Sequence, residues 1–168
     1  MAANPKYNNR DRPGFSKEYG IDTNNLNGLL PWDWVNEKLS KSRNYWIVST
    51  RKNGNPHSAP VWEIYFEEIL YFATNEKSQK AVNLVHNPSV VVHLESGDDA
   101  VIIEGTANPV TDKDFLEKLS IVYGQKYQSY QPPPDFGAGT VVYAVKPKIV
   151  FAWKENDFTN TPTRWVFD

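Results

Sequence analysis

The sequence predicts a mainly β fold, an antiparallel β-barrel with peripheral α-helices. Short runs rich in β-branched and aromatic residues follow one another, and turn residues separate them. Only three stretches space their apolar residues as an amphipathic helix does, and most connections are short enough to be hairpins. The chain has 168 residues, of which 40% are apolar and 14% aromatic, so it can bury the core of a single domain.

Residues 1–30 are expected to form an irregular N-terminal arm that precedes the folded domain, residues 31–168. The arm holds six Asn, two Pro and three Gly without any period. It is either a disordered tail or an arm that wraps over a partner subunit. Under the second alternative its anchors are Tyr7, Phe15, Tyr19 and Ile21.

The first elements predicted after the arm are a helix and a β-hairpin. Residues 31–42 begin with a proline, which suits the first turn of a helix, and their apolar residues recur at i, i+3 and i+7. Residues 45–51 and 56–66 are β-rich runs, and the Asn53-Gly54 turn between them is a strong hairpin signal. Pro60 within the second run indicates a bulge or an unpaired edge.

A strand, a helix and two further strands are predicted next. Residues 69–74 continue the hairpin as a third strand. Residues 77–86 have helical spacing and end at Asn-Pro, and residues 90–94 form an almost continuous apolar strand. Residues 100–107 return antiparallel to it, and Gly105 indicates a bulge or the close approach of another backbone.

The last part of the chain predicts one helix and three strands. The helix covers residues 111–123 and begins with Thr-Asp, either of which can cap it. Residues 125–138 include three consecutive prolines and form a long loop. The strands are residues 140–145 and 149–154, which pair around Lys146 and Pro147, and residues 163–167.

Composition excludes several classes of function. A net charge of −2 provides no general basic surface for nucleic acid or an anionic membrane, so we expect neither as a partner. The absence of Cys excludes disulfides, thiolate metal sites and cysteine nucleophiles. The three His are scattered, so we expect no metal site. The first thirty residues show no secretory signal pattern and no run approaches about 18 apolar residues, so we expect a cytoplasmic protein.

A candidate anion site lies in the run from Thr74 to Lys80, TNEKSQK. A predicted strand ends and a helix begins there, so unpaired N–H groups and the positive end of the helix dipole favour an anion. The hydroxyls of Thr74 and Ser78 and the ammonium groups of Lys77 and Lys80 belong to the same run. The alternative interpretation is an ordinary capped helix with solvated lysines.

A flat ring could lie beside a neighbouring strand. Residues 57–62 place small side chains before Trp62, and a ring system could accept hydrogen bonds from such an edge. Trp165 is expected in the core on general grounds. The sequence contains no Gly-rich phosphate loop and no Gly-x-Ser-x-Gly motif. We therefore assign no catalytic side chain.

The run from Tyr71 to Glu95 resembles the pyridoxamine 5′-phosphate oxidase-like superfamily, whose members are split β-barrels that bind a flavin or the deazaflavin F420. The family pattern is a strand ending in Thr, then Ser-x-Lys-Ala opening a helix, then Asn-Pro and a strand. Here these are Thr74, residues 78–81, Asn87-Pro88 and residues 90–94. Residues 103–107 resemble the later Glu-Gly strand, and the resemblance covers residues 31–168.

The resemblance implies an FMN-binding split barrel and a homodimer with the cofactor at its interface, FMN first and F420 as the alternative. Ser78 and Lys80 would hold the phosphate, and residues 60–62 would line the ring. The C-terminal run 162–165 resembles the closing strand of the F420 branch. The cofactor-binding residues implied are Pro60, Val61, Trp62, Thr74, Asn75, Lys77, Ser78, Lys80, Arg164 and Trp165.

The resemblance has departures that bear on activity. The chain ends in RWVFD instead of the Arg-rich substrate motif of the oxidases, and Gln79 stands where the family often has Arg. We therefore do not expect oxidation of a vitamin B6 phosphate. The first hypothesis is an FMN- or F420-dependent oxidoreductase acting on a small planar organic substrate by hydride transfer. The others are a non-catalytic flavin- or haem-binding or storage protein, and a structural barrel with an empty cleft.

Overall fold

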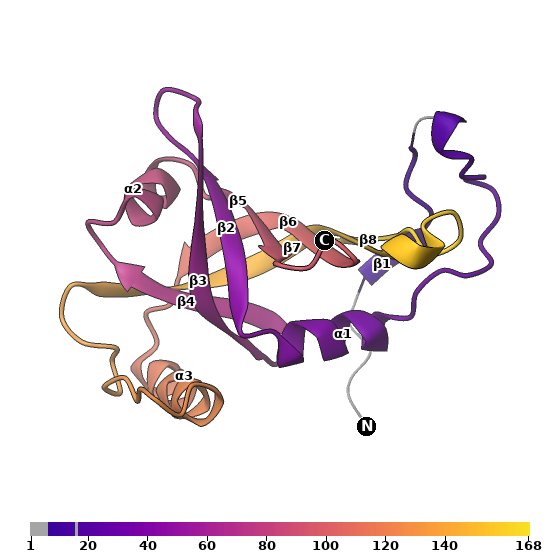
Figure 1. Cartoon of the computed structure of the whole chain (residues 1–168). Helices are drawn as coiled ribbons and strands as arrows, with labels where there is room; N and C mark the ends of the chain where they lie inside the picture. Colours follow the sequence, from indigo (N-terminus) through magenta and orange to yellow (C-terminus); the bar gives the residue numbers. More distant parts are fainter. Residues whose placement is uncertain (1–6, 16) are drawn as a thin grey trace.

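The computed structural model describes residues 7–15 and 17–168, and its strands form an antiparallel barrel (Figure 1). In the described residues the sheet order is β1-β8-β7-β4-β3-β2-β5-β6, and a further pairing of β6 with β7 closes six strands on themselves. The strands are β1 (Tyr7–Asp11), β2 (Asn44–Thr50), β3 (Pro56–Phe66), β4 (Ile69–Asn75), β5 (Ser89–Leu94), β6 (Asp99–Pro109), β7 (Thr140–Lys154) and β8 (Thr163–Phe167). The predicted fold class, mainly β with a split barrel and peripheral helices, is confirmed.

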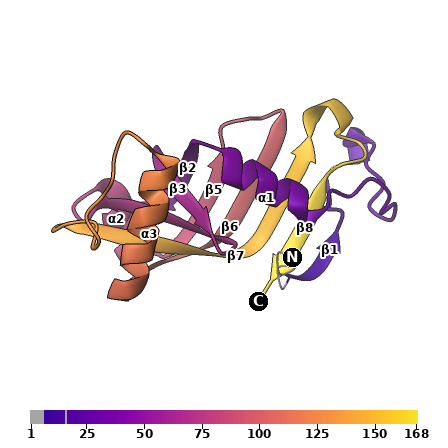
Figure 2. The same ribbon diagram turned by 90° about the horizontal axis from the view of Figure 1, so that it is seen from below.

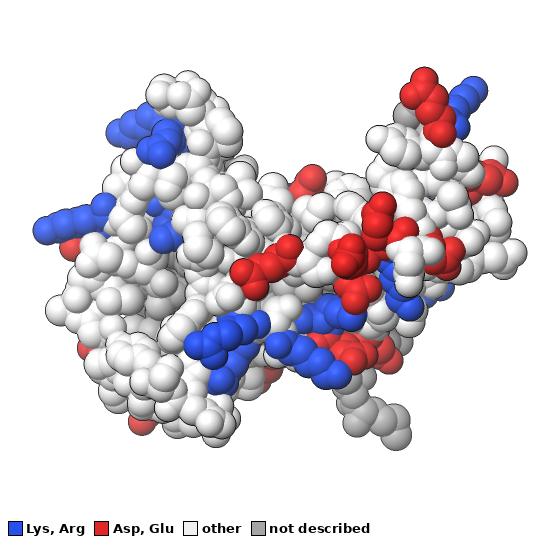
Figure 3. Space-filling view, in the orientation of Figure 1, with Lys and Arg blue, Asp and Glu red and all other residues white. Residues whose placement is uncertain are grey.

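Three helices lie around the barrel, as predicted. They are α1 (Trp32–Lys41), α2 (Gln79–His86) and α3 (Lys113–Lys126). Figure 2 shows that α1 and α3 lie apart along the barrel, while β1 and β8 extend the sheet beyond it. None of the helices in the described part of the chain has the length and apolar character needed to cross a membrane. Figure 3 shows positive and negative side chains interspersed over the α1 side of the molecule, without one dominant sign.

The longest ladder closes the barrel between β6 and β7. Its register shifts between Glu104 and Gly105, which lie opposite Ile149 and Pro147, so Lys148 of β7 is the extra residue and the bulge predicted at Gly105 is confirmed. A Cβ on Gly105 would lie 2.2 Å from the carbonyl oxygen of Lys146, so glycine is required where the two backbones approach. The prediction of two strands around Lys146 and Pro147 is wrong. The ladder continues through this point as the single strand β7, because a proline without an N–H is tolerated at a bulge.

The core fills the barrel and continues under α1. In β2 the inward residues Tyr45, Ile47 and Ser49 are buried, and their neighbours on the other face are half-buried. The helix α1 adds one buried face, made of Trp32, Val35 and Leu39. A second, smaller apolar cluster lies between α3 and the strands β3 and β4. Burial of these faces holds the helices on the barrel.

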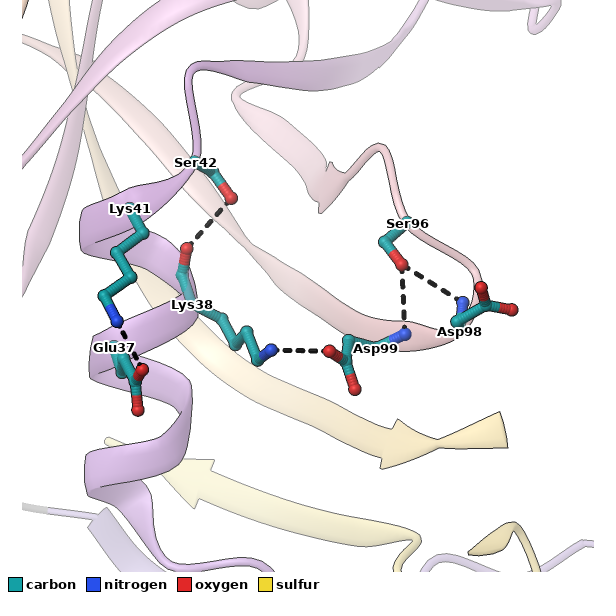
Figure 4. Close-up of polar contacts among 7 residues, drawn as sticks. All are labelled: Glu37, Lys38, Lys41, Ser42, Ser96, Asp98 and Asp99. Carbon is teal, nitrogen blue, oxygen red and sulfur yellow. Dashed lines mark hydrogen bonds and ion pairs between the residues drawn. The ribbon is translucent and has the colours of Figure 1, made fainter. Parts of the chain in front are cut away.

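Polar contacts supplement the packing of α1 (Figure 4). Lys38 Nζ lies 2.5 Å from Asp99 Oδ2 and so joins α1 to the start of β6. The hydroxyl of Ser96 accepts hydrogen bonds from the backbone N–H groups of Asp98 and Asp99 at 3.2 and 3.1 Å, which shapes the turn between β5 and β6. The side chains of Lys38 and Asp99 remain partly exposed, so the ion pair contributes only about 0–1 kcal/mol.

The prediction that residues 1–30 are irregular is wrong for residues 7–11, which form β1. This strand pairs antiparallel with β8, at the other end of the sequence, and its own residues are mostly polar and exposed, so no local pattern indicated it. Arg12 follows it and is buried, and its guanidinium donates to the backbone carbonyls of Asn25, Asn27 and Asn160. These described parts of the arm therefore pack on their own chain.

The remaining predictions for the arm have different outcomes. Phe15 and Tyr19 anchor it, since their rings lie 5.3 and 5.8 Å from the ring of Phe158. Residues 1–6 and 16 lie outside the described residues. The wrapping of a partner subunit and the division of the chain at residue 31 stay predictions.

Candidate functional site

The barrel is split along one side of β3. Residues 56–62 of this strand pair with β2, but only residues 63–66 pair with β4. The last residues of β4, up to Asn75, pair with β7 instead. Residues 57–62 of β3 therefore have no strand partner on the β4 side among the described residues. Pro60 has its partner Trp46 on β2 alone, which confirms the predicted edge.

Three side chains of the predicted anion site converge where β4 ends and α2 begins. The Thr74 and Ser78 hydroxyl oxygens lie 3.0 Å apart, and Lys80 Nζ donates to Thr74 Oγ1 at 3.4 Å. Ser78 also caps α2, because its Oγ accepts the N–H of Ala81 at 3.3 Å. Two hydroxyls, one ammonium group and the first turn of a helix therefore surround one point, a donor set suited to a phosphate.

The other two residues of this run lie at its rim. Asn75 Oδ1 accepts the N–H of Lys77 at 2.9 Å, and its backbone oxygen accepts the N–H of Ser78 at 2.9 Å. Asn75 therefore shapes the turn. The side chain of Lys77 is exposed, so its charge lies toward solvent.

The electrostatics of the cluster favour an incoming anion. Partial burial lowers the pKa of Lys80 below its usual value. The pKa of His57 is also lowered, first by burial and then by the positive charges of Arg51 and Lys80. His57 Nδ1 is buried and lacks a hydrogen-bond partner in the structure. An anion beside Lys80 would offset the desolvation of its ammonium group.

The helix α2 is anchored below this cluster by a polar chain. Asn83 is buried, and its amide donates to Ser49 Oγ of β2 at 2.9 Å. Gln79 donates to Asn83 Oδ1 at 2.7 Å. Gln79, at the position where the family often has Arg, therefore uses its amide to hold the helix. Sequence reasoning missed His57 and Asn83, because only strand register and helix packing bring them to this place.

The predicted ring-lining residues separate in the structure. Pro60 is exposed at the split, whereas Val61 packs partly buried against the main core. Trp62 stacks on Tyr127 at a centroid distance of 4.6 Å and an interplanar angle of 3°. The guanidinium of Arg43 lies 4.9 Å from the Trp62 ring centroid. Trp62 therefore belongs to the α3 side, and Pro60 is the one that lies on the open edge.

The predicted C-terminal site residues lie elsewhere. Trp165 has no exposed surface and packs edge-on against Trp32 at 5.3 Å, so it is a core residue. Arg164 forms a two-pronged ion pair with Asp11 of β1. Arg164 lies opposite residue 151 of β7 and Thr74 lies opposite residue 141, so ten residues, about 33 Å of strand, separate them. Within one chain, Arg164 and Trp165 do not reach the Thr74–Ser78–Lys80 cluster.

A second buried polar group lies at the other end of β3. Glu63 has no exposed surface, and its two carboxylate oxygens lack hydrogen-bond partners in the structure. Burial raises the pKa of Glu63 to about 8. Lys126 Nζ donates to Tyr45 Oη at 2.8 Å and to the Glu63 backbone oxygen at 2.9 Å, and burial lowers its pKa to about 8. No motif indicated this group, because it depends on how α3 covers the barrel.

Solved structures of other proteins share this fold. A conserved hypothetical protein of Mycobacterium tuberculosis superposes with a TM-score of 0.70 and 21% identity, over 80% of this chain and 91% of that chain. An F420 reductase gives 0.55 and 24%, over 68% and 94%. The haem storage protein HutZ of Vibrio cholerae gives 0.62 and 13%, over 70% and 91%.

These structures share the fold of this chain, while the sequence itself carries the family assignment. No curated protein sequence matches the chain. Residues 32–154, nearly three-quarters of it, match the sequence profile described as pyridoxamine 5′-phosphate oxidase. The matched segment contains the split between β3 and β4 and the Thr74–Ser78–Lys80 cluster. The chain belongs to the pyridoxamine 5′-phosphate oxidase family and has its split β-barrel.

Proposed function

We propose that this protein is an oxidoreductase that binds FMN, or alternatively F420, and transfers hydride to or from a small planar organic substrate. The observation that carries the proposal is the convergence of Thr74, Ser78 and Lys80 at the start of α2. This cluster lies beside the split where the edge of β3 has no strand partner. A planar cofactor that carries a phosphate matches both features. The cluster supplies donors for the phosphate, and the open edge of β3 offers a flat surface to the ring.

The cluster fits a phosphate in its donor chemistry. Lys80 supplies a charge-assisted donor, and Thr74 and Ser78 supply hydroxyls that can turn to donate. The half-buried position of Lys80 strengthens such a bond, because less water competes there. Asn75 and Lys77 complete the rim of this proposed site. His57, with its unpartnered Nδ1, is a further group able to meet a ligand oxygen.

The bound flavin or deazaflavin would supply the hydride chemistry, so the protein needs no nucleophile of its own. The chain's residues bind and orient it. Pro60 and the neighbouring backbone of β3 offer the ring an edge free of a strand, and α2 fixes the phosphate end. FMN is proposed first because Ser78 and Lys80 form a single compact anion site. F420 is the alternative, supported by the likeness to the F420 reductase.

We propose that two copies of the chain form the working unit, with the cofactor at their interface. The support is the outer face of the barrel, where β2, β5, β6 and β7 present half-buried apolar side chains. They are Trp46, Val48, Val91, Ile102, Ile149 and Phe151. A groove of about 330 Å³ runs over this face between Val48 and Ile149. A second copy would bury this apolar surface, and its own Arg164 could then approach the site.

The oligomeric state in solution tests the proposed dimer. Sedimentation velocity of the Val91→Asp variant tests the interface, because an aspartate on that face would break an apolar contact. A dimer in the native chain and a folded monomer in the variant support the proposal, and a native monomer refutes it.

We place the protein in the cytoplasm, in keeping with its lack of Cys.

The alternative function is a non-catalytic protein that binds or stores a flavin or haem. The structural likeness to a haem storage protein supports this alternative. Turnover separates the two functions. A bound flavin that NAD(P)H or a reduced F420 partner reduces, and that an organic acceptor reoxidises, supports the enzyme. A ligand that stays bound without any electron transfer supports storage.

The binding experiment uses Lys80→Ala with Lys118→Ala as the matched control, since Lys118 is exposed on α3 and loses the same charge. We expect Lys80→Ala to weaken FMN binding roughly 5- to 150-fold, as loss of about 1–3 kcal/mol of charge-assisted bonding implies. Isothermal titration with FMN, and in parallel with F420, measures it. Equal affinities of both variants would remove Lys80 from the site.

A further inference from the structure

A second pocket lies at the opposite end of β4 from the Thr74–Ser78–Lys80 cluster. It has a volume of about 330 Å³, at the lower end of the range for small-molecule sites. Four parts of the chain meet there: the start of α1, the turn between β3 and β4, the middle of β7 and the end of β8. Its lining includes Trp32, Glu67, Glu68, Lys146, Pro147 and Phe167. We call it the β3–β4 turn pocket.

The turn that forms its wall has an unusual backbone. Glu67 and Glu68 both have positive φ angles, 50° and 63°. A two-residue hairpin with two left-handed residues normally has Asn-Gly, because glutamate is disfavoured there. The sequence nevertheless places two carboxylates at this point. Left-handed glutamates persist only where the surrounding structure holds them, so this turn fixes both carboxylates at the pocket.

The carboxylate of Glu68 provides the independent observation. Its Oε1 is buried and has no hydrogen-bond partner among the described residues, while the side chain as a whole is partly buried and Asn36 of α1 faces its carboxylate. Glu68 also lines a much smaller neighbouring pocket, together with Trp32, Tyr65 and Leu70. A buried carboxylate oxygen without a donor is costly, and an incoming N–H group would satisfy it. Trp32, more than nine-tenths buried, lines both pockets, and its Nε1–H has no hydrogen-bond partner among the described residues.

The charges and apolar walls of the pocket define the ligand. The lining side chains have a formal net charge of −2. Three are acidic, namely Glu67, Glu68 and Asp168, and one is basic, Lys146. The apolar lining comes from Trp32, Ile69, Pro147 and Phe167. This negative balance disfavours an anion, and a cation with an apolar body matches the lining.

We propose that the β3–β4 turn pocket binds a small organic cation, an amine with an aromatic or similarly apolar body, whose ammonium group pairs with Glu68. The apolar body lies against Trp32 and Phe167. The site is separate from the proposed cofactor site, because Ile69 and Thr74 are five residues, about 16 Å, apart on β4. It therefore does not depend on which cofactor the protein binds.

The test uses three probes that share an indole ring and differ in charge: tryptamine, neutral 3-methylindole and anionic indole-3-acetate. Isothermal titration into the full-length protein measures their affinities. We expect tryptamine to bind at least tenfold more tightly than either analogue. Equal or tighter binding of indole-3-acetate would overturn the proposal, and so would the absence of tryptamine binding.

Variants locate the binding. Glu68→Gln keeps the shape of the side chain and should weaken tryptamine at least tenfold. Glu117→Gln, an exposed change of the same charge on α3, should leave the affinity unchanged. Thermal unfolding checks that both variants fold. Tryptamine should also shift the indole N–H resonance of Trp32, identified from its loss in Trp32→Phe. Unchanged binding in Glu68→Gln, or loss in both variants, would contradict the assignment.

Discussion

Replacement of Glu63 by glutamine should remove a pH dependence of stability that is built into β3. The carboxyl group of Glu63 ionises near 4.5 in an unfolded chain and near 8 in the folded protein, where burial disfavours its charge. Between these values the folded state holds one more proton than the unfolded state. Stability that is fully present below pH 4.5 is therefore lost progressively as the pH rises toward 8.

The size of the effect follows from this difference. Each pH unit within the window changes the free energy of unfolding by about 1.4 kcal/mol, so a rise from pH 5.5 to 7.5 should cost roughly 2–3 kcal/mol. A glutamine side chain resembles the protonated acid and cannot ionise, so the Glu63→Gln variant lacks this contribution. Lys126, whose pKa is lowered to about 8, adds a contribution of opposite sign only above that pH.

The assay is urea unfolding of the native chain and Glu63→Gln at half-unit steps from pH 5.5 to 7.5. The control is Glu117→Gln, an exposed change on α3. We expect Glu63→Gln to lose roughly 2–3 kcal/mol less than the native chain over this range, and the control to follow the native chain. Other titrating groups, including His57, are common to all three proteins and cancel in the difference. Parallel curves for the native chain and Glu63→Gln would refute the reasoning.

Three further predictions concern the barrel and the cofactor site. Gly105→Ala should destabilise the protein by about 1–3 kcal/mol in urea unfolding, because the new Cβ would lie 2.2 Å from a carbonyl of β7, whereas Gly97→Ala has open space and should change little. Asn83→Ala should cost about 1–3 kcal/mol in the same assay, since it leaves buried hydrogen-bonding groups unpaired. Burial lowers the pKa of Lys80, so this side chain should lose its positive charge at a lower pH than an ordinary lysine. FMN affinity, measured in the same titrations, should therefore fall as the pH rises toward the usual lysine pKa, and Lys80→Ala should show no such fall.

Local signals in the sequence predicted much of the barrel. The bounds of β3 and β8 agree with the predictions because turn residues flank both runs. The strand β1 was missed because its partner lies at the other end of the chain and its own residues show no apolar alternation. Lys146 and Pro147 carry the local signature of a turn, and only pairing with β6 on both sides of the bulge keeps β7 continuous there.

The candidate site shows the same division between local and distant information. Thr74, Ser78 and Lys80 could be grouped from the sequence because a strand end and a helix start bring neighbours in the chain together. The burial of Trp165 depends on how β8 folds back against α1, which no short segment determines. The burial of Glu63 likewise depends on α3, which packs from much further along the chain.

The most direct test of the central claim, that this barrel is a flavin or deazaflavin protein, is the absorption spectrum of the protein purified from its natural host, with mass spectrometry of the released ligand. The account predicts the visible bands of an oxidised flavin or deazaflavin and a released mass of FMN or F420. A colourless protein whose thermal unfolding is unchanged by added FMN and by added F420 would contradict it.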